Sequence, residues 1–234
     1  MDTSRRSFVR GLAAAGVAMP GVAAFREDAF ARLFKANAIA GARTPAEVAE
    51  DELYWAQIQR AFDADRTMIN LNNGGISPTP GHVLEQMIRD LKFTNELPVE
   101  HMWRILQPRM ETTRRELAKE FGCSPEEMAI VRNASEANEI MIYGIDLKKG
   151  DEVIVTNQNY GRMIATWQQR ERREGIVLKQ VAFKVPPPSD QYIVDQFAAA
   201  ITPRTRVIEV THITNLTGQI MPVREIMRLA KSRG

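Results

Sequence analysis

The feature that most constrains this chain is a regular alternation of short apolar runs and amphipathic segments in its second half. The apolar runs are short and rich in Val and Ile, as strands are, and the segments between them have the apolar spacing of helices. Strands are predicted at 128–132, 152–156, 176–183 and 206–210, and helices at 135–145, 161–173, 190–200 and 223–231. This alternation indicates βαβ units and an α/β fold, with a mainly parallel sheet covered by helices on both faces.

The part of the chain before this alternation is predicted to be mostly helical. Residues 46–62 have helical spacing and follow a start signal at Thr44 and Pro45, within an N-terminal linker and helical arm that covers 25–66. A short strand is expected at 68–71, a loop rich in Asn, Gly and Pro at 72–80, and helices at 81–91 and 105–121. The arm is therefore expected to precede a large domain at 67–234.

Residues 1–24 are predicted to be an export signal and not part of the fold. The paired Arg5 and Arg6 are followed by Ser7, Phe8 and a Gly- and Ala-rich apolar run, a pattern that resembles a twin-arginine signal peptide. Such a signal implies a periplasmic or extracellular protein. The run is too short to form a stable membrane span. An ordinary basic terminus stays open as the alternative.

The charge of the chain argues against a nucleic acid as partner. The formal net charge is +2, and the three arginines and one aspartate of residues 1–24 account for all of it. The rest is therefore close to neutral and has no basic stripe, which is the footprint of a nucleic-acid-binding surface. With 44% hydrophobic and 26% charged residues, the composition is that of a globular protein.

Thiol and imidazole groups are too few and too scattered for a metal site. The single cysteine, Cys123, excludes an internal disulfide and is expected near the end of a helix. The histidines, His82, His101 and His212, lie far apart and lack the spacing of a ligand motif. No metal ligand is therefore predicted.

The strongest indication of a ligand lies at 131–140, where a predicted strand end leads through small polar residues into a helix. The first backbone N–H groups of a helix have no partner within it, and the helix dipole is positive there, so this position suits a bound phosphate. Ala134, Ser135 and Glu136 would line it, and Ser135 adds a hydroxyl donor. The alternative is an N-cap alone, with Ser135 holding the first turn.

Two further loops follow strands of the predicted sheet, at the edge where such sheets bind ligands. Tyr160 comes after the strand at 152–156 and can stack on a planar ring. Alternatively, it packs half-buried on the next helix. Asn215 comes after the strand at 206–210 and can hydrogen-bond a ring hydroxyl, while Gly218 permits a tight turn. Alternatively, this segment forms a turn without a ligand.

Together these loops resemble the class V aminotransferase family, which uses pyridoxal 5′-phosphate on the fold-type I scaffold. The resemblance is to its isopenicillin N epimerase-like and cysteine desulfurase-like branch, and it runs from about residue 69 to residue 234. It implies that the turn at 133–137 holds the cofactor phosphate, that Tyr160 stacks on the ring and that Asn215 contacts the phenolic oxygen.

The same resemblance implies a substrate side and an assembly. The loop at 72–78 resembles the family's early substrate-side loop, which makes Asn73 and Gly74 candidate substrate-binding residues. A small-molecule amino substrate and a homodimer are implied by the family.

The resemblance also implies residues that this chain does not offer. In the family a lysine forms a Schiff base with the cofactor and a carboxylate keeps the ring nitrogen protonated. Both come later in the family's order than the segment at Gly234, and none of the eight lysines is expected on a loop at the carboxyl end of a strand. No catalytic residue is therefore assigned.

The chain is accordingly expected to be a truncated, incomplete form of the enzyme fold. The alternatives are a non-catalytic remnant that binds a phosphorylated ligand or a partner, and half of a split enzyme. The apolar face of the helix at 223–229 is expected to lack cover in such a chain.

Overall fold

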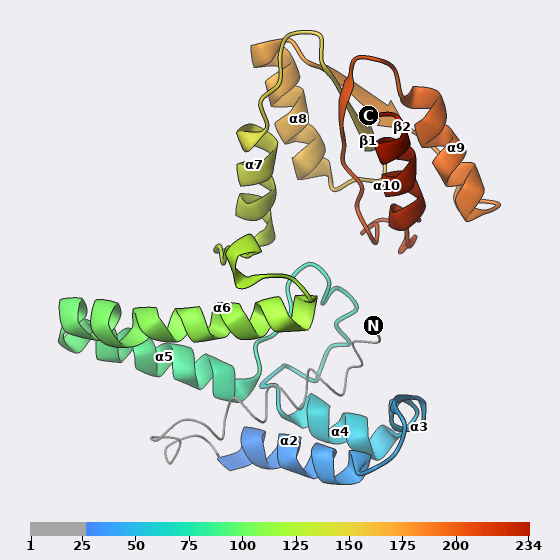
Figure 1. Ribbon diagram of the computed structural model, residues 1–234. Helices are drawn as coiled ribbons and strands as arrows, with labels where there is room; N and C mark the ends of the chain where they lie inside the picture. The colour runs from blue at the N-terminus through green and yellow to red at the C-terminus, as the bar shows by residue number, and fades with distance from the viewer. Residues whose placement is uncertain (1–26) are drawn as a thin grey trace. The chain divides into compact units, whose positions relative to one another are not determined.

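The computed structural model describes residues 27–234, which form two units, one ending at Ile130 and the other comprising Val131–Gly234 (Figure 1). The export signal predicted at 1–24 lies outside the described residues, and the domain boundary predicted at 66/67 stays a prediction.

The second unit is built on a parallel sheet of three strands. The central strand is β1, Glu152–Thr156, with β2, Val177–Val181, on one side and β3, Thr205–Ile208, on the other. β1 pairs with β2 along its whole length, whereas a register shift after Glu152 interrupts its pairing with β3. The predicted parallel sheet is confirmed, with β2 and β3 shorter than expected.

Helices cover both faces of this sheet, as the alternation predicts. α7, Ala134–Gly144, and α8, Gly161–Glu174, lie on one side, and α9, Asp190–Ala200, and α10, Val223–Ser232, lie on the other (Figure 1). The connections from β1 to β2 and from β2 to β3 run in opposite directions across the sheet. Right-handed crossovers therefore put α8 and α9 on opposite faces.

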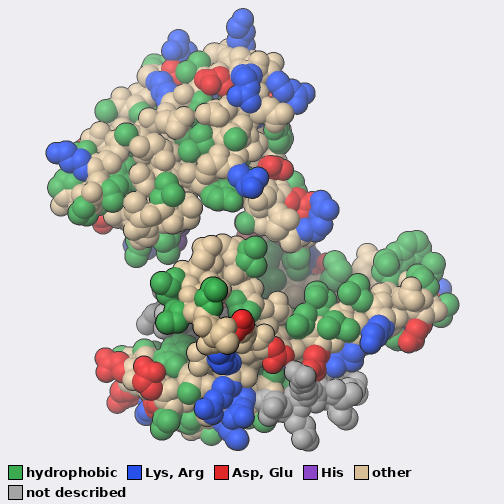
Figure 2. Space-filling model, turned by 180° about the vertical axis from the view of Figure 1, so that it is seen from behind, with side chains coloured by type: hydrophobic (Ala, Val, Ile, Leu, Met, Phe, Trp, Pro, Cys, Tyr) green, Lys and Arg blue, Asp and Glu red, His purple; other side chains and the backbone are tan. Residues whose placement is uncertain are grey.

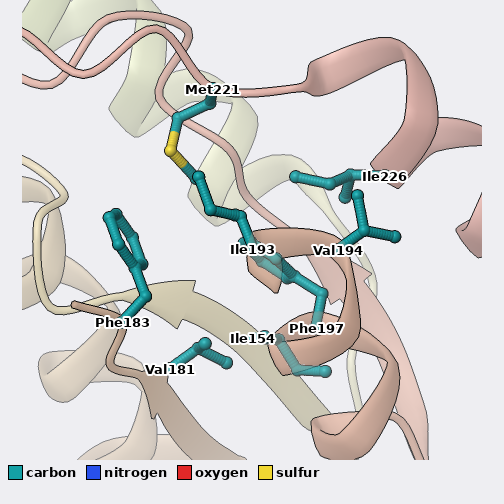
Figure 3. Close-up of a cluster of buried hydrophobic side chains, with 8 residues drawn as sticks. All are labelled: Ile154, Val181, Phe183, Ile193, Val194, Phe197, Met221 and Ile226. Atoms are coloured by element: carbon teal, nitrogen blue, oxygen red, sulfur yellow. The ribbon is translucent and has the colours of Figure 1, made fainter. Parts of the chain in front are cut away.

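The central strand β1 is buried on both faces, and its side chains divide between two apolar cores. Val153 and Val155 pack with Trp167 of α8, while Ile154 points to the opposite face and packs with Phe197 of α9 (Figure 3). All of these side chains are at most 1% exposed. Full burial of one such side chain contributes about 1.5–3 kcal/mol, so the alternation along β1 holds both helix layers to the sheet.

The apolar face of α10 is covered, so the expectation from the sequence was wrong. Ile226 is 1% exposed and lies in the same core as residues of α9, with Met221 from the segment before α10 (Figure 3). Val223 and Leu229, three residues to either side of Ile226, are partly buried against this core. One stripe of α10 therefore faces α9, which supplies the cover.

A buried carboxylate joins the strands at the amino edge of the sheet. Glu152 is 0% exposed, and its oxygens accept hydrogen bonds from Lys179 Nζ at 2.7 Å, Thr202 Oγ1 at 2.6 Å and Arg204 Nη2 at 2.8 Å. Hydrogen bonds from Lys179 and Thr202 lower the pKa of Glu152 to about 2, although burial acts in the opposite direction. Since these groups come from β1, β2 and the segment before β3, the network connects all three strands.

The described part of the first unit begins with short helices, namely α2, Glu27–Ala40, α3, Pro45–Ala49, and α4, Glu52–Arg60. Val48 of α3 and Tyr54 of α4 are buried in a small core with two alanines of α2. The helix predicted at 46–62 is divided, because Asp51 accepts hydrogen bonds from the amides of Leu53 and Tyr54 and so caps a new helix.

Longer helices follow in the first unit. They are α5, Gly81–Glu96, the π-helical segment η2, Glu100–Leu106, and α6, Gln107–Phe121. α5 runs beyond its predicted end at residue 91, and Gly122, with φ +71°, ends α6 just before the exposed Cys123. Of the helices in residues 27–234, none is both long enough and apolar enough to cross a membrane.

Apolar side chains are exposed along these longer helices. Leu91, Val99, Trp103 and Phe121 are each more than 60% exposed, and hydrophobic side chains gather visibly over α5, η2 and α6 (Figure 2). A monomer rarely leaves so many large apolar groups open, so this surface is available for association.

Two predicted strands are absent from the described residues. Residues 68–71 form bends and irregular structure, with Ile69 85% and Leu71 92% exposed. Residues 128–132 are also without strand pairing, after a 3₁₀ turn η3, Pro125–Glu127, and Ile130 is 49% exposed. An apolar run becomes a strand only where a neighbour completes its hydrogen bonds, and neither run has one within residues 27–234.

Candidate functional site

The candidate phosphate turn is the start of α7, and Asn133 caps it. Asn133 has extended backbone angles, and its Oδ1 accepts a hydrogen bond from the amide of Glu136 at 2.9 Å. The capping role that the sequence offered to Ser135 therefore belongs to Asn133. The Ser135 hydroxyl has no hydrogen-bond partner within residues 27–234, which leaves it available to a ligand.

The first amides of α7 are open as well. Among the described residues, no acceptor contacts the N–H groups of Ala134 and Ser135, whereas the amide of Glu136 is used by the cap. Open amides at the positive end of a helix dipole attract anions. Ala134 and Ser135 thus offer two amide donors and one hydroxyl to a phosphate.

The side chain of Glu136 does not take part in phosphate binding, because it pairs with Arg132. Its carboxylate accepts hydrogen bonds from the Arg132 guanidinium at 2.8 Å and from the Arg132 amide at 2.9 Å. The side-chain hydrogen bond from Arg132, followed by that from its amide, lowers the pKa of Glu136. The ion pair partly neutralises a carboxylate that would otherwise repel a phosphate at the same helix end.

A shallow cavity of about 540 Å³ lies along α7 and includes the phosphate turn. Its lining residues are Arg132, Asn133, Ser135, Glu136, Glu139, Ile140 and Tyr143. Tyr160 and Asn215 are outside this lining. The cavity therefore overlaps part of the phosphate turn and includes neither of the other candidate residues.

Tyr160 stands at the start of α8, directly after the loop that follows β1. It occupies the N-cap position with φ −58° and ψ 124°, and its side chain is 46% exposed. Within residues 27–234, its ring stacks on no other aromatic ring. About half of the Tyr160 side chain is therefore accessible to a ligand.

The structure brings Tyr160 and the phosphate turn to the same edge of the sheet. Tyr143, near the end of α7, donates a hydrogen bond to Gln169, and Arg170 donates to the carbonyl of Ile145 at 2.9 Å. Because Gln169 and Arg170 lie near the end of α8, the two helices run in the same direction (Figure 1). Both helix starts therefore lie at the carboxyl edge of β1, where open parallel sheets bind ligands.

Asn215 lies in a tight turn that follows β3. Thr214 is 1% exposed, and its amide and hydroxyl pair with Gln219 across the turn, while Gly218 adopts φ +70°. The amide of Asn215 is exposed and has no hydrogen-bond partner within residues 27–234. The turn that the sequence offered as the alternative to a ligand site is therefore present. The free side-chain amide of Asn215 can still bind a ligand.

The predicted substrate-side residues belong to the first unit. Asn73 accepts a hydrogen bond from the Asn70 side chain at 2.8 Å and donates one to the Asn70 carbonyl at 3.3 Å. Gly74 lies in the same exposed turn, with open space where a side chain would stand. These contacts are local to the loop, and the assignment of Asn73 and Gly74 to a substrate stays a prediction.

Sequence reasoning missed a carboxylate at this edge. Glu209 follows β3 directly, and its oxygens accept hydrogen bonds from Asn159 Nδ2 at 2.8 Å and Trp167 Nε1 at 2.6 Å. The position of Glu209 at a strand end was visible in the sequence. Its partners, 50 and 42 residues away, were not.

The lysines need one correction. Lys179 is held at the amino edge by Glu152, as expected for a lysine outside the site. Lys184, however, follows β2 by three residues and so lies on a loop at the carboxyl side, where the sequence predicted no lysine. It is exposed, and no ion pair holds it within residues 27–234. In the same part of the chain, no group of three or more His, Cys, Asp or Glu side chains could hold a metal ion.

Comparison with known proteins defines the class. The family model for aminotransferase class-V matches residues 69–234. The chain therefore belongs to the class V aminotransferase family.

Among curated relatives, isopenicillin N epimerase from Amycolatopsis lactamdurans is 28% identical over 183 residues, covering 77% of this chain and 46% of the relative. A probable cysteine desulfurase from Synechocystis sp. is 29% identical over 175 residues, covering 71% of this chain and 41% of the relative. The chain thus spans about half the length of the curated relatives it matches.

Solved structures give the same fold. A C-DES variant with glycine covalently linked to its PLP cofactor matches with a TM-score of 0.62 and 25% identity, over 68% of this chain and 42% of that one. The cysteine desulfurase CsdA from Escherichia coli matches with a TM-score of 0.61 at 19% identity, over 76% of this chain and 46% of that one, which bears on the fold alone. The unit built on β1 has the fold-type I architecture, and the family's cofactor is pyridoxal 5′-phosphate.

The described residues fit this cofactor in part. The open amides of Ala134 and Ser135 suit its phosphate, and the half-exposed Tyr160 at the same edge suits its ring. Asn215 offers a free amide on the loop after β3. A lysine for covalent attachment is not assigned.

Proposed function

We propose that the second unit forms the phosphate- and ring-holding part of a pyridoxal-phosphate site, in an enzyme that acts on an amino acid or a related amine. The observation that carries the proposal is the common position of the starts of α7 and α8 at the carboxyl edge of β1. The relatives named isopenicillin N epimerase and cysteine desulfurase support an amino acid as substrate class.

The chain's own residues would divide the work of holding the cofactor. The amides of Ala134 and Ser135 and the Ser135 hydroxyl donate to the phosphate. Tyr160 would cover one face of the ring and exclude water from it, and Asn215 would donate to the phenolic oxygen. When bound, pyridoxal phosphate supplies an electron sink for the substrate's Cα.

The source of a reactive lysine separates three forms of this proposal. An incomplete enzyme chain, half of a split enzyme and a non-catalytic ligand-binding remnant all use the same phosphate turn. They differ in whether a lysine attaches the cofactor, and in which polypeptide carries that lysine.

The test is a titration of the purified chain with pyridoxal phosphate, followed by borohydride reduction and peptide mass spectrometry. We expect saturable binding that inorganic phosphate displaces and no stoichiometric lysine adduct. A stoichiometric adduct on Lys184, lost in Lys184→Ala but kept in Lys231→Ala, would show that this chain carries the lysine itself. Binding that phosphate cannot displace would contradict the proposed role of the α7 start.

We also propose export through the twin-arginine route. Support comes from Arg5 and Arg6 followed by Ser7, Phe8 and the apolar run up to residue 24. A reporter fused behind residues 1–24 should reach the periplasm, and Arg5→Lys with Arg6→Lys should retain it in the cytoplasm. Equal export of both forms through another route would contradict the proposal.

A homodimer is proposed from the family and from the apolar surface of α5, η2 and α6. Leu91, Val99 and Trp103 on this surface are each more than 60% exposed. Sedimentation equilibrium should give twice the chain mass, and Val99→Asp with Trp103→Asp should shift the protein toward monomer. A monomeric wild-type chain at all concentrations would contradict it.

A further inference from the structure

We propose that Glu209 is a positioning residue that sets the orientation of Tyr160 at the carboxyl edge of the sheet. The inference rests on the proposed function, in which Tyr160 covers the cofactor ring. It adds a residue that neither the sequence pattern nor the resemblance assigns.

Glu209 is itself fixed to the sheet. It follows β3 directly, and its backbone N–H donates to the Ile154 carbonyl of β1 at 2.9 Å. Its carboxylate therefore projects from a rigid element. Both carboxylate oxygens accept a hydrogen bond, one from Asn159 Nδ2 at 2.8 Å and one from Trp167 Nε1 at 2.6 Å.

Asn159 links Glu209 to the loop before Tyr160. It is 2% exposed, and its Oδ1 accepts hydrogen bonds from the Thr156 hydroxyl at 2.7 Å and the Thr156 amide at 3.2 Å. The amide group of Asn159 thus spans from the end of β1 to Glu209. The residue immediately before Tyr160 is held on both sides.

Trp167 links Glu209 to α8. It is 1% exposed and lies seven residues after Tyr160, about two helical turns along the helix that Tyr160 starts. Two points that flank Tyr160 are therefore tied to one carboxylate. The Tyr160 side chain, 46% exposed, has no aromatic partner among the described residues, so the anchored backbone on either side is what sets the point from which the ring projects.

The chemistry of the group explains why a carboxylate is needed. Two N–H donors converge on Glu209, and a carboxylate accepts from both, whereas a glutamine has one acceptor oxygen and an NH₂ group that would face a donor. Within residues 27–234, no Lys, Arg or His forms an ion pair with Glu209. Its two neutral donors are thus its side-chain partners, and Glu209→Gln frees one of them.

The experiment compares wild type, Glu209→Gln and Glu209→Asp as purified full chains. Pyridoxal phosphate is achiral, so circular dichroism in its absorption band reports a ring held in a fixed orientation. Affinity for inorganic phosphate, measured by calorimetry, reports the α7 turn alone. We expect Glu209→Gln to lose at least half of the induced dichroism per bound cofactor, with phosphate affinity unchanged within twofold.

Glu209→Asp keeps the charge but withdraws the carboxylate by one methylene, so it should lose dichroism as well and serves if Glu209→Gln does not fold. Glu174→Gln is the matched control, because it removes a carboxylate that Arg170 binds at the far end of α8. It should leave the dichroism at the wild-type level. A general loss of structure would instead lower phosphate affinity and dichroism together.

The outcomes separate the two claims. Full wild-type dichroism in folded Glu209→Gln and Glu209→Asp, with cofactor and phosphate still bound, overturns the positioning role and leaves the proposed function standing. A wild-type chain that binds neither inorganic phosphate nor pyridoxal phosphate overturns the proposed function, and the positioning role with it.

Discussion

The two edges of the same sheet are built on different principles. At the amino edge, Glu152 is buried and its oxygens are saturated by Lys179, Thr202 and Arg204. At the carboxyl edge, the amides of Ala134 and Ser135 have no partner within the described residues. Saturated groups stabilise the fold, whereas open donors in a positive field are what an anionic ligand needs. The comparison predicts that stability and binding can be changed separately at the two edges.

The largest effect is expected from Glu152→Ala. Removing the buried carboxylate breaks its charged hydrogen bonds, while Lys179 and Arg204 stay 29% and 70% exposed and keep part of their hydration, so the free energy of unfolding should fall by about 2 kcal/mol. Urea denaturation of the purified chain measures it. The control is Glu225→Gln, which removes a surface ion pair with Arg228 and should cost less than about 1 kcal/mol. Equal, small losses in both variants would contradict the assigned role of the amino edge.

Acid should weaken the same edge over a defined range. The pKa of Glu152 is lowered from 4.5 to about 2 in the folded chain, so folding favours its ionised form. The resulting stability is fully present above pH of about 4.5 and is lost as the pH falls toward about 2. The difference in unfolding free energy between wild type and Glu152→Gln should shrink across this range. A difference independent of pH there would contradict the assignment.

A smaller effect on stability, coupled to binding, is expected from Asn133→Ala. Loss of the N-cap of α7 should cost about 1 kcal/mol and should weaken phosphate binding, because the first turn is no longer held. Ser189→Ala is the matched control, since Ser189 caps α9 through the amide of Tyr192. It should cost a similar amount without changing phosphate affinity. Thermal unfolding and calorimetry report the two quantities.

The smallest change in stability is expected from Ser135→Ala. The Ser135 hydroxyl has no partner within residues 27–234, so unfolding should change by less than about 0.5 kcal/mol. Loss of one hydrogen bond to the ligand should weaken phosphate affinity by about threefold to tenfold. Ser232→Ala, at the far end of α10, should change neither quantity. Unaltered affinity in Ser135→Ala would remove the hydroxyl from the site.

Sequence patterns predicted the second unit closely and the first unit poorly. From β1 to α10, each element lies within two residues of its expected bounds, because apolar period and burial agree there. The runs at 68–71 and 128–132 have strand-like composition but no pairing neighbour among the described residues, and composition cannot reveal that. Asp51 caps a new helix and so divides the single helix that was expected. The prediction followed the helical spacing of the apolar residues and overlooked this local cap.

The sequence by itself determined the alternation of strands and helices, the parallel sheet and the small polar turn at the start of α7. These features depend on neighbouring residues, since backbone period and helix capping are local. The cap from Asn133 to the Glu136 amide is local too, because it spans three residues. Only the tertiary structure decided that α7 and α8 start at one edge, and that Glu209 joins Asn159 to Trp167. Those contacts join segments far apart in the chain, so they depend on strand order and crossover handedness, which no short window of sequence contains.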